Sequence, residues 1–143
     1  MIIRELAQGE TALAYVVMRS LRPHLSDEES FVVQVGTQRN KGYRLAGVFD
    51  EDAEHARAVA GFRFTTSLAW GYHCYIDDLA TLPEARGRGY GTGLLRWVHD
   101  LAKAEGASQV HLDSGTQPER QDAHRLYFQN GYRINSFHFS APV

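Results

Sequence analysis

The chain has one cysteine, Cys74, and it has neither a long apolar run nor a large excess of charge of either sign. A lone cysteine cannot form an internal disulfide, and this usage is typical of a reducing compartment. No stretch is apolar over the length of a membrane span, and the early charges at Arg4 and Glu5 are unlike a secretory signal. A net charge of −2 gives no general attraction for nucleic acid or for an anionic membrane. We therefore expect a cytoplasmic protein.

The sequence also lacks internal repeats, low-complexity tracts and long linkers. Its 143 residues are 43% hydrophobic and 22% charged, a composition typical of one soluble domain, expected over residues 1–143. The histidines have no spacing of the kind His-x-x-x-His that zinc ligands on a helix adopt. No metal site is expected.

Hydrophobic periodicity predicts the order strand, two helices, three strands, helix, strand, helix, strand, which is an α/β or α+β layout with a mixed sheet. Ser26 is the expected N-cap of the second helix, and Thr116 with Glu119 is the expected capping box of the last. The expected strands are 2–6, 43–49, 58–67, 71–82, 109–113 and 132–140, the last of them as one closing strand or as a broken pair of strands. The expected helices are 10–25, 26–38, the segment from the glycines to Gly106, and the segment from Thr116 to Asn130.

The segment RGRGYGTG, residues 86–93, is the most informative part of the chain. Glycine loses more conformational freedom on folding than other residues, so four glycines in eight positions need a physical reason. A strand that runs through a glycine-rich turn into a helix presents unpaired backbone N–H groups, which together with the helix dipole suit phosphate or pyrophosphate. Arg86 and Arg88 would add positive charge. A Rossmann fingerprint would need glycine at Thr92 or Leu94, and a P-loop would need Lys followed by Ser or Thr.

The spacing of Arg86, Gly89 and Gly91 matches the pattern Arg/Gln-x-x-Gly-x-Gly/Ala. Together with the upstream "YIDDLATLPEARGRGYG" and the downstream "DAHRLYFQNGY", it resembles the GCN5-related N-acetyltransferase (GNAT) family over about residues 70–135. The resemblance implies a GNAT-like mixed, mostly antiparallel sheet flanked by helices. It also implies a V-shaped split between the strand that ends at Leu82 and the strand around Val110.

The resemblance assigns the split to acetyl-CoA as co-substrate. The backbone of Leu79, Ala80 and Thr81 would pair with the pantetheine arm, and an amide near Leu79 would stabilise the oxyanion formed on the thioester. The pyrophosphate would be bound by the turn and the start of the helix, namely Arg86, Gly87, Arg88, Gly89, Tyr90, Gly91 and Thr92.

The resemblance also suggests two catalytic side chains. Tyr127 stands at the family's general-acid position, although an aromatic residue on an amphipathic helix is more commonly part of a core. Asp77 is the candidate general base, acting directly or through water, because the polyamine-acetylating branch has a Glu-Asp pair here. Asp77 and Asp78 could instead be edge or bulge residues that bind nothing. Nothing in the sequence activates Cys74, so a covalent acetyl-cysteine route is not expected.

The function expected from these residues is an N-acetyltransferase that transfers the acetyl group of acetyl-CoA to a primary amine by direct attack in a ternary complex. The alternative is a non-catalytic acyl-CoA-binding regulatory module, which would keep the glycine loop but would not need Tyr127. The acceptor remains open among small-molecule amines, peptide N-termini and protein lysines. The closing segment 132–140 is expected to form an edge strand, through which a homodimer could assemble.

Overall fold

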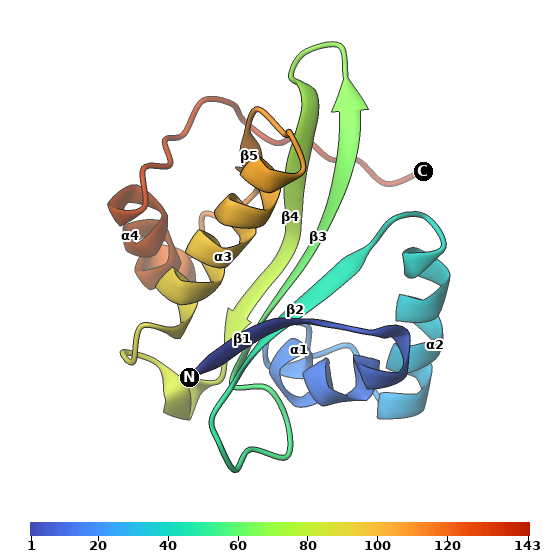
Figure 1. Cartoon of the computed structure of the whole chain (residues 1–143). Coiled ribbons are helices and arrows are strands. Elements are labelled where there is room, and N and C mark those ends of the chain that lie inside the picture. Colours follow the sequence, from blue (N-terminus) through green and yellow to red (C-terminus); the bar gives the residue numbers. More distant parts are fainter. The chain divides into compact units, whose positions relative to one another are not determined.

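The computed structural model describes residues 1–143 and groups them into two compact units, residues 1–112 and residues 113–143. The first unit contains a five-stranded sheet in the order β1-β2-β3-β4-β5 (Figure 1). Strands β1 to β4 pair antiparallel, and β5 pairs parallel to β4. The strand bounds are Ile2–Leu6 (β1), Arg44–Phe49 (β2), Ala58–Ser67 (β3), Gly71–Thr81 (β4) and Val110–Leu112 (β5). The predicted mixed, mostly antiparallel sheet is confirmed.

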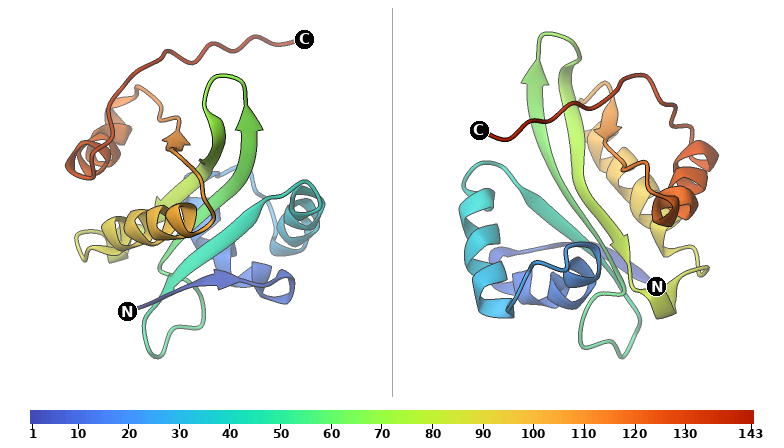
Figure 2. Two further views of the ribbon diagram at one scale, coloured as in Figure 1. Left: turned by 45° about the horizontal axis from the view of Figure 1, so that its top comes forward. Right: turned by 180° about the vertical axis from the view of Figure 1, so that it is seen from behind.

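Helices cover both faces of this sheet. The ring of Phe62 on β3 meets the ring of Trp97 on α3, with centroids 6.2 Å apart. The neighbouring Gly61 faces the opposite side, where Tyr43 and Asp78 lie. Helices α1 and α2 therefore lie on one face and α3 on the other (Figure 2). The helix bounds in this unit are Gln8–Ala14 (η1, a 3₁₀ helix), Tyr15–Leu21 (α1), Glu28–Arg39 (α2), Pro83–Ala85 (η2, 3₁₀) and Tyr90–Ala104 (α3).

The core lies on both faces of the sheet, under α3 on one side and under α1 and α2 on the other. Leu94, Leu95 and Val98 are fully buried on one face of α3, as their helical spacing predicts. On the α3 face of the sheet, Val48 and Phe62 are equally inaccessible to solvent, and on the opposite face so are Leu6, Leu45 and Val59. Burying each such side chain stabilises the fold by roughly 1.5–3 kcal/mol. This packing fixes β4 and the start of α3, which carry most of the predicted site.

Two expectations about the first helices are corrected by the structure. The segment 10–25 is not one α-helix, because η1 precedes α1, and α1 ends at Leu21. Arg22 precedes Pro23 and has φ −120° and ψ 78°, since a residue before proline is kept out of the helical region. The N-cap of α2 is Asp27 and not Ser26, because Asp27 Oδ1 accepts a hydrogen bond from the Ser30 amide at 2.8 Å.

The second unit contains η3, a 3₁₀ turn over Pro118–Arg120, and α4 over Gln121–Gln129. The end of α4 is as predicted, with Asn130 as C-cap and Gly131 at φ +85°. The predicted capping box of Thr116 and Glu119 is wrong, because η3 starts from Gln117 without a side-chain cap. The predicted strand 132–140 is also wrong, since residues 132–143 form no strand. Alternation supplies a pattern for a strand, but it does not supply the partner strand whose backbone would complete the hydrogen bonds.

No helix in the structure combines the length and apolar character that a membrane span requires.

Candidate active site

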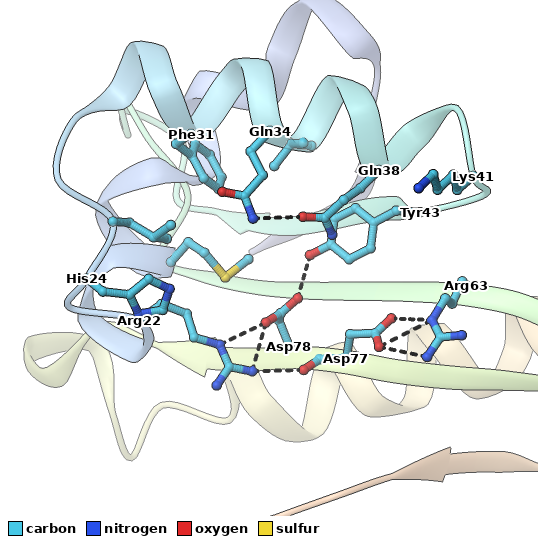
Figure 3. Close-up of a pocket in the computed structure, with 13 residues that line it drawn as sticks. Arg22, His24, Phe31, Gln34, Gln38, Lys41, Tyr43, Arg63, Asp77 and Asp78 are labelled. Carbon is cyan, nitrogen blue, oxygen red and sulfur yellow. Dashed lines mark hydrogen bonds and ion pairs between the residues drawn. The ribbon is translucent and has the colours of Figure 1, made fainter. Parts of the chain in front are cut away.

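A β-bulge in β4 brings the acidic pair onto one face of the sheet. Gly61 pairs with Asp78 and Phe62 pairs with Ile76, so Asp77 is an extra residue in β4. Consecutive side chains of a regular strand point to opposite faces, and a bulge interrupts this alternation. Both aspartates consequently line the same cavity (Figure 3).

Asp78 is fixed by a hydrogen bond from the buried Tyr43. The Tyr43 hydroxyl donates to Asp78 Oδ2 at 2.7 Å, and a Cβ at Gly61 would collide with that hydroxyl. Glycine at position 61 therefore leaves the space in which this bond forms. Burial, and then the charge of Asp78, raise the pKa of Tyr43 well above its usual value, so Tyr43 remains a donor.

The cavity has a volume of about 620 Å³, within the range of roughly 300–1,000 Å³ that small-molecule sites occupy. Its walls come from the end of α1 and the loop that follows, from one side of α2, from the turn after α2, and from β3 and β4. The lining residues are Met18, Arg22, His24, Leu25, Phe31, Gln34, Val35, Gln38, Lys41, Tyr43, Arg63, Asp77 and Asp78.

Two arginines hold the acidic pair. Arg22 donates from Nε and Nη2 to Asp78 Oδ1 at 3.1 and 3.0 Å, and its Nη2 also donates to the Asp77 carbonyl at 3.1 Å. Arg63 binds both carboxylate oxygens of Asp77, with its shortest contact at 2.9 Å. Arg22 thereby ties the loop after α1 to the bulge (Figure 3).

The part of β4 beyond the bulge has a strand partner on one side only. Leu79, Ala80 and Thr81 pair with β3, whereas the pairing with β5 ends at Ile76 opposite Leu112. The other edge of residues 79–81 is thus free of a neighbouring strand. An extended amide-containing chain could add to this edge in the way that a peptide extends a sheet.

The glycine segment is a left-handed turn that leads into α3. Gly87 and Gly89 have φ +76° and +82°, a conformation that side chains with a Cβ rarely adopt. Gly89 is the N-cap of α3 without a side-chain cap, and the Gly93 amide makes the helix's first bond, to the Gly89 carbonyl, at 2.9 Å. The amides before Gly93 therefore have no partner within the helix and suit an anion. Arg86 and Arg88 are exposed beside them.

Two residues of this segment have structural roles as well. Tyr90 is buried, and its hydroxyl donates to Asp50 Oδ1 at 2.6 Å, so it could reach a ligand only through its backbone. That bond is the main reason why the pKa of Asp50 is lowered. A Cβ at Gly93 would lie 3.0 Å from Ile3 Cδ1, so Gly93 serves the close packing of α3 on β1.

Tyr127 lies on α4 in the second unit. Its ring is 5.8 Å from the ring of Tyr132, and burial raises the pKa of its hydroxyl above the usual value while Arg120 opposes the shift. In the first unit, Cys74 is fully buried, and burial raises the pKa of its thiol to about 12. A buried neutral thiol is a poor nucleophile, which argues against an acetyl-cysteine route. No group of three His, Cys, Asp or Glu residues lies close enough to hold a metal ion.

Sequence reasoning missed Tyr43 and Arg63. One signal could have found Arg63, because a β3–β4 hairpin with its turn near residues 68–70 pairs Arg63 with Tyr75, two residues from Asp77. No comparable signal links Tyr43 to Asp78, since β2 and β4 are separated by β3 in the sheet.

Comparison with known proteins gives matches in sequence and in fold. The model of the acetyltransferase (GNAT) family matches residues 10–132. The uncharacterized N-acetyltransferase YhdJ of Bacillus subtilis (strain 168) is 35% identical over 138 residues, which are 96% of this chain and 94% of that protein. An aminoalkylphosphonate N-acetyltransferase of Salmonella typhimurium is 38% identical over 68 residues, which are 48% of this chain and 43% of that protein. A Trypanosoma brucei acetyltransferase has the same fold, with a TM-score of 0.80 at 16% identity over 99% of both chains.

Proposed function

The chain belongs to the acetyltransferase (GNAT) family of acyltransferase enzymes, and we propose that it transfers the acetyl group of acetyl-CoA to a primary amine. The transfer is direct, within a ternary complex. One observation carries the proposal: β4 runs without interruption from the acidic cavity at Asp77 and Asp78 to the unpaired edge at Leu79–Thr81. An amine in the cavity and a thioester along that edge would meet on one strand.

The residues of the first unit fit the co-substrate. The amides from Gly89 to Thr92, with Arg86 and Arg88, would bind the pyrophosphate, and residues 79–81 would pair with the pantetheine arm. When bound, acetyl-CoA supplies a thioester carbonyl that an amine can attack. An amide of β4 near Leu79 would donate to the carbonyl oxygen.

Two side chains would handle the protons. Asp77 would take the proton of the attacking amine, directly or through water; its side chain is 27% exposed, against 15% for Asp78. Asp78 is held by Arg22 and Tyr43 and would act as a positioning residue. Tyr127 would donate a proton to the leaving thiolate, and its raised pKa keeps that proton in place at neutral pH.

The cavity favours a small acceptor. Its volume and its enclosure by α1, α2 and β4 suit a small amine. The name of the Salmonella typhimurium relative specifies aminoalkylphosphonates, which are small primary amines, although that match spans less than half of each chain. A non-catalytic acyl-CoA-binding module, the alternative reading, leaves the acidic cavity without a role.

Calorimetry and thiol release test the proposal. Acetyl-CoA should bind one per chain, with coenzyme A competing and with ATP and NAD binding much more weakly. Loss of a charge-assisted phosphate contact costs about 1.5–3 kcal/mol, so Arg86→Ala with Arg88→Ala should raise the Kd at least about tenfold. The Kd of S-acetylpantetheine, which has no pyrophosphate, should be the same for the double variant and the wild type. Arg96→Ala, which removes an exposed arginine farther along α3, is the matched control.

Glycine variants of the turn are less suitable for this purpose. Valine at Gly89 would be strained at φ +82° whatever the ligand, so a loss of binding would not separate the fold from the site. Acetyl-CoA binding that is unchanged in the double arginine variant would remove the turn from the cofactor site. Tight acetyl-CoA binding without acetylation of any amine in a broad panel would favour the regulatory module.

The base is tested through the pH dependence of kcat/KM. Asp77→Asn should lower kcat/KM most near neutral pH, where the amine must be deprotonated by the enzyme. The loss should shrink at alkaline pH, where free amine is present without help. A loss that stays constant across pH would exclude Asp77 as the base.

A further inference from the structure

Both carboxylates of the cavity are already paired with neighbouring side chains. Both oxygens of Asp77 accept from Arg63. Asp78 Oδ1 accepts from Arg22, and its Oδ2 accepts from Tyr43. An acceptor that brought a second positive charge would find no uncompensated carboxylate in this cavity.

Lys41 is a cation of the cavity lining for which the structure shows no ion pair. The cavity contains the cations Arg22, Lys41 and Arg63 against Asp77 and Asp78, which leaves one net positive charge when His24 is counted as neutral. Lys41 lies at the end of the cavity beyond Gln38 and Tyr43 (Figure 3).

The backbone around Lys41 is fixed in place. The Lys41 amide donates to the Gln38 carbonyl at 2.9 Å, and the Gly42 amide donates to the Arg39 carbonyl at 3.0 Å. Gly42 has φ +98°, which closes the turn between α2 and β2. The lysine stem therefore starts from a defined point at the cavity end. On α2, which precedes this turn, the amide side chains of Gln34 and Gln38 line the cavity and are hydrogen-bonded to each other at 3.3 Å.

We infer that the acceptor of the proposed acetyl transfer carries an anionic group, a carboxylate or phosphonate, a few bonds from its amine, and that Lys41 binds this group. This inference rests on the proposed function, since it assigns the amine to the Asp77 end of the cavity. Tyr43 connects the two ends of the cavity, because it follows Lys41 by two residues in the chain and its hydroxyl donates to Asp78. Both ends line one cavity of about 620 Å³, which suits a short ω-amino acid or aminoalkylphosphonate. A diamine would place its second charge near Lys41 and be repelled.

Three amines that differ only at their far end test the inference: 4-aminobutanoate, 4-aminobutanamide and 1,4-diaminobutane. The intact enzyme should acetylate them in the order anion, neutral amide, cation, with at least about a tenfold advantage in kcat/KM for the anion over the amide, equivalent to one paired charge. Lys41→Gln should bring the ratio of anion to amide close to one. Lys41→Glu should invert the ratio of anion to diamine.

Lys103→Gln and Lys103→Glu are the matched controls, because Lys103 is an exposed lysine on α3 away from the cavity lining. They should leave both ratios unchanged. A wild-type preference for the amide or the diamine, or ratios that Lys41 variants do not change, would overturn the anionic acceptor while acetyl transfer itself stands. Acetylation of none of the three, while another amine of the broad panel is acetylated, would overturn the inference alone; acetylation of no amine at all, with acetyl-CoA bound tightly, would contradict the proposed function.

Discussion

At the scale of single residues, the demands on a proton donor and on a proton acceptor are opposite. A donor must keep its proton until the leaving group needs it. Burial raises the pKa of Tyr127 above the usual tyrosine value of about 10, so its hydroxyl is protonated throughout the neutral range. The same shift makes Tyr127 a weaker acid, so donation to a thiolate depends on a pre-aligned hydrogen bond.

Tyr127→Phe isolates this donation. The substitution removes one hydroxyl, and the ring contact with Tyr132 at 5.8 Å does not depend on it. The kcat should fall at least about tenfold, because general acid catalysis contributes roughly 10²–10⁴-fold. The Kd of acetyl-CoA, measured by calorimetry, should be unchanged. A variant with the wild-type kcat would leave water as the proton donor.

Tyr43 predicts a loss of stability at alkaline pH. Its pKa is raised well above the usual value, chiefly by burial, so the folded chain keeps this proton at a pH where the unfolded chain has lost it. The unfolded state then binds fewer protons than the folded state, and the free energy of unfolding falls as the pH rises above about 10. Below that pH the contribution of Tyr43 is fully present.

Tyr43→Phe tests this linkage in urea titrations between neutral and strongly alkaline pH. At neutral pH the variant should be less stable by about 1.5–3 kcal/mol, because Asp78 loses a hydrogen-bond donor to its charge. The difference from wild type should narrow above about pH 10. Tyr72→Phe, at a half-exposed position on β4, should keep the wild-type stability. A gap that stays constant with pH would contradict the linkage.

At the scale of elements, the N-cap of α2 is formed by only one of two adjacent polar residues, Asp27 and not Ser26. Asp27 has extended backbone angles and accepts bonds from both the amide and the hydroxyl of Ser30. The hydrogen bond from the Ser30 amide is the largest reason why the pKa of Asp27 is lowered. Ser26, the residue expected from the sequence, donates its hydroxyl hydrogen bond to Asp27 at 3.3 Å and not to an amide of the helix.

Asp27→Ala should therefore lower the free energy of unfolding by about 1 kcal/mol, the usual cost of losing an N-cap. Ser26→Ala, its matched neighbour, should cost a few tenths of a kcal/mol at most. Chemical denaturation of both variants measures the difference. Equal losses would mean that the cap is shared between the two residues.

The sequence predicts those features that depend on residues close together in the chain, and it does not predict those that depend on contacts between distant residues. The strands β1 to β4 and the helix α3 follow from period-two and helical patterns, and the glycine turn follows from backbone requirements within a few residues. Asp77 and Asp78 were found from their motif, but Arg22 and Tyr43 lie 56 and 35 positions from Asp78, and Arg63 lies 14 positions from Asp77. Their meeting depends on sheet register, on the bulge and on the space at Gly61, and none of these is written in a local pattern.

At the scale of the whole molecule, the segment after α4 exposes apolar side chains. Ile134, Phe137 and Phe139 are 75%, 85% and 90% exposed, and residues 132–143 pair with no strand. Within its unit, the segment makes an ion pair between His138 and Asp113 at 2.8 Å, and both side chains are half or more exposed. Apolar groups gathered on one short extended segment favour association with another surface.

We propose that the partner of this segment is the same segment of a second copy. Two copies of residues 133–139 could pair antiparallel about a twofold axis, which would satisfy their backbone groups and cover the phenylalanines. Light scattering at tens of micromolar should then give the mass of a dimer. Phe137→Ser with Phe139→Ser should give the mass of one chain. Leu68→Ser, which changes a still more exposed apolar residue in the β3–β4 hairpin, should keep the dimer. A wild-type protein that scatters as a monomer would show that the exposed segment does not mediate self-association.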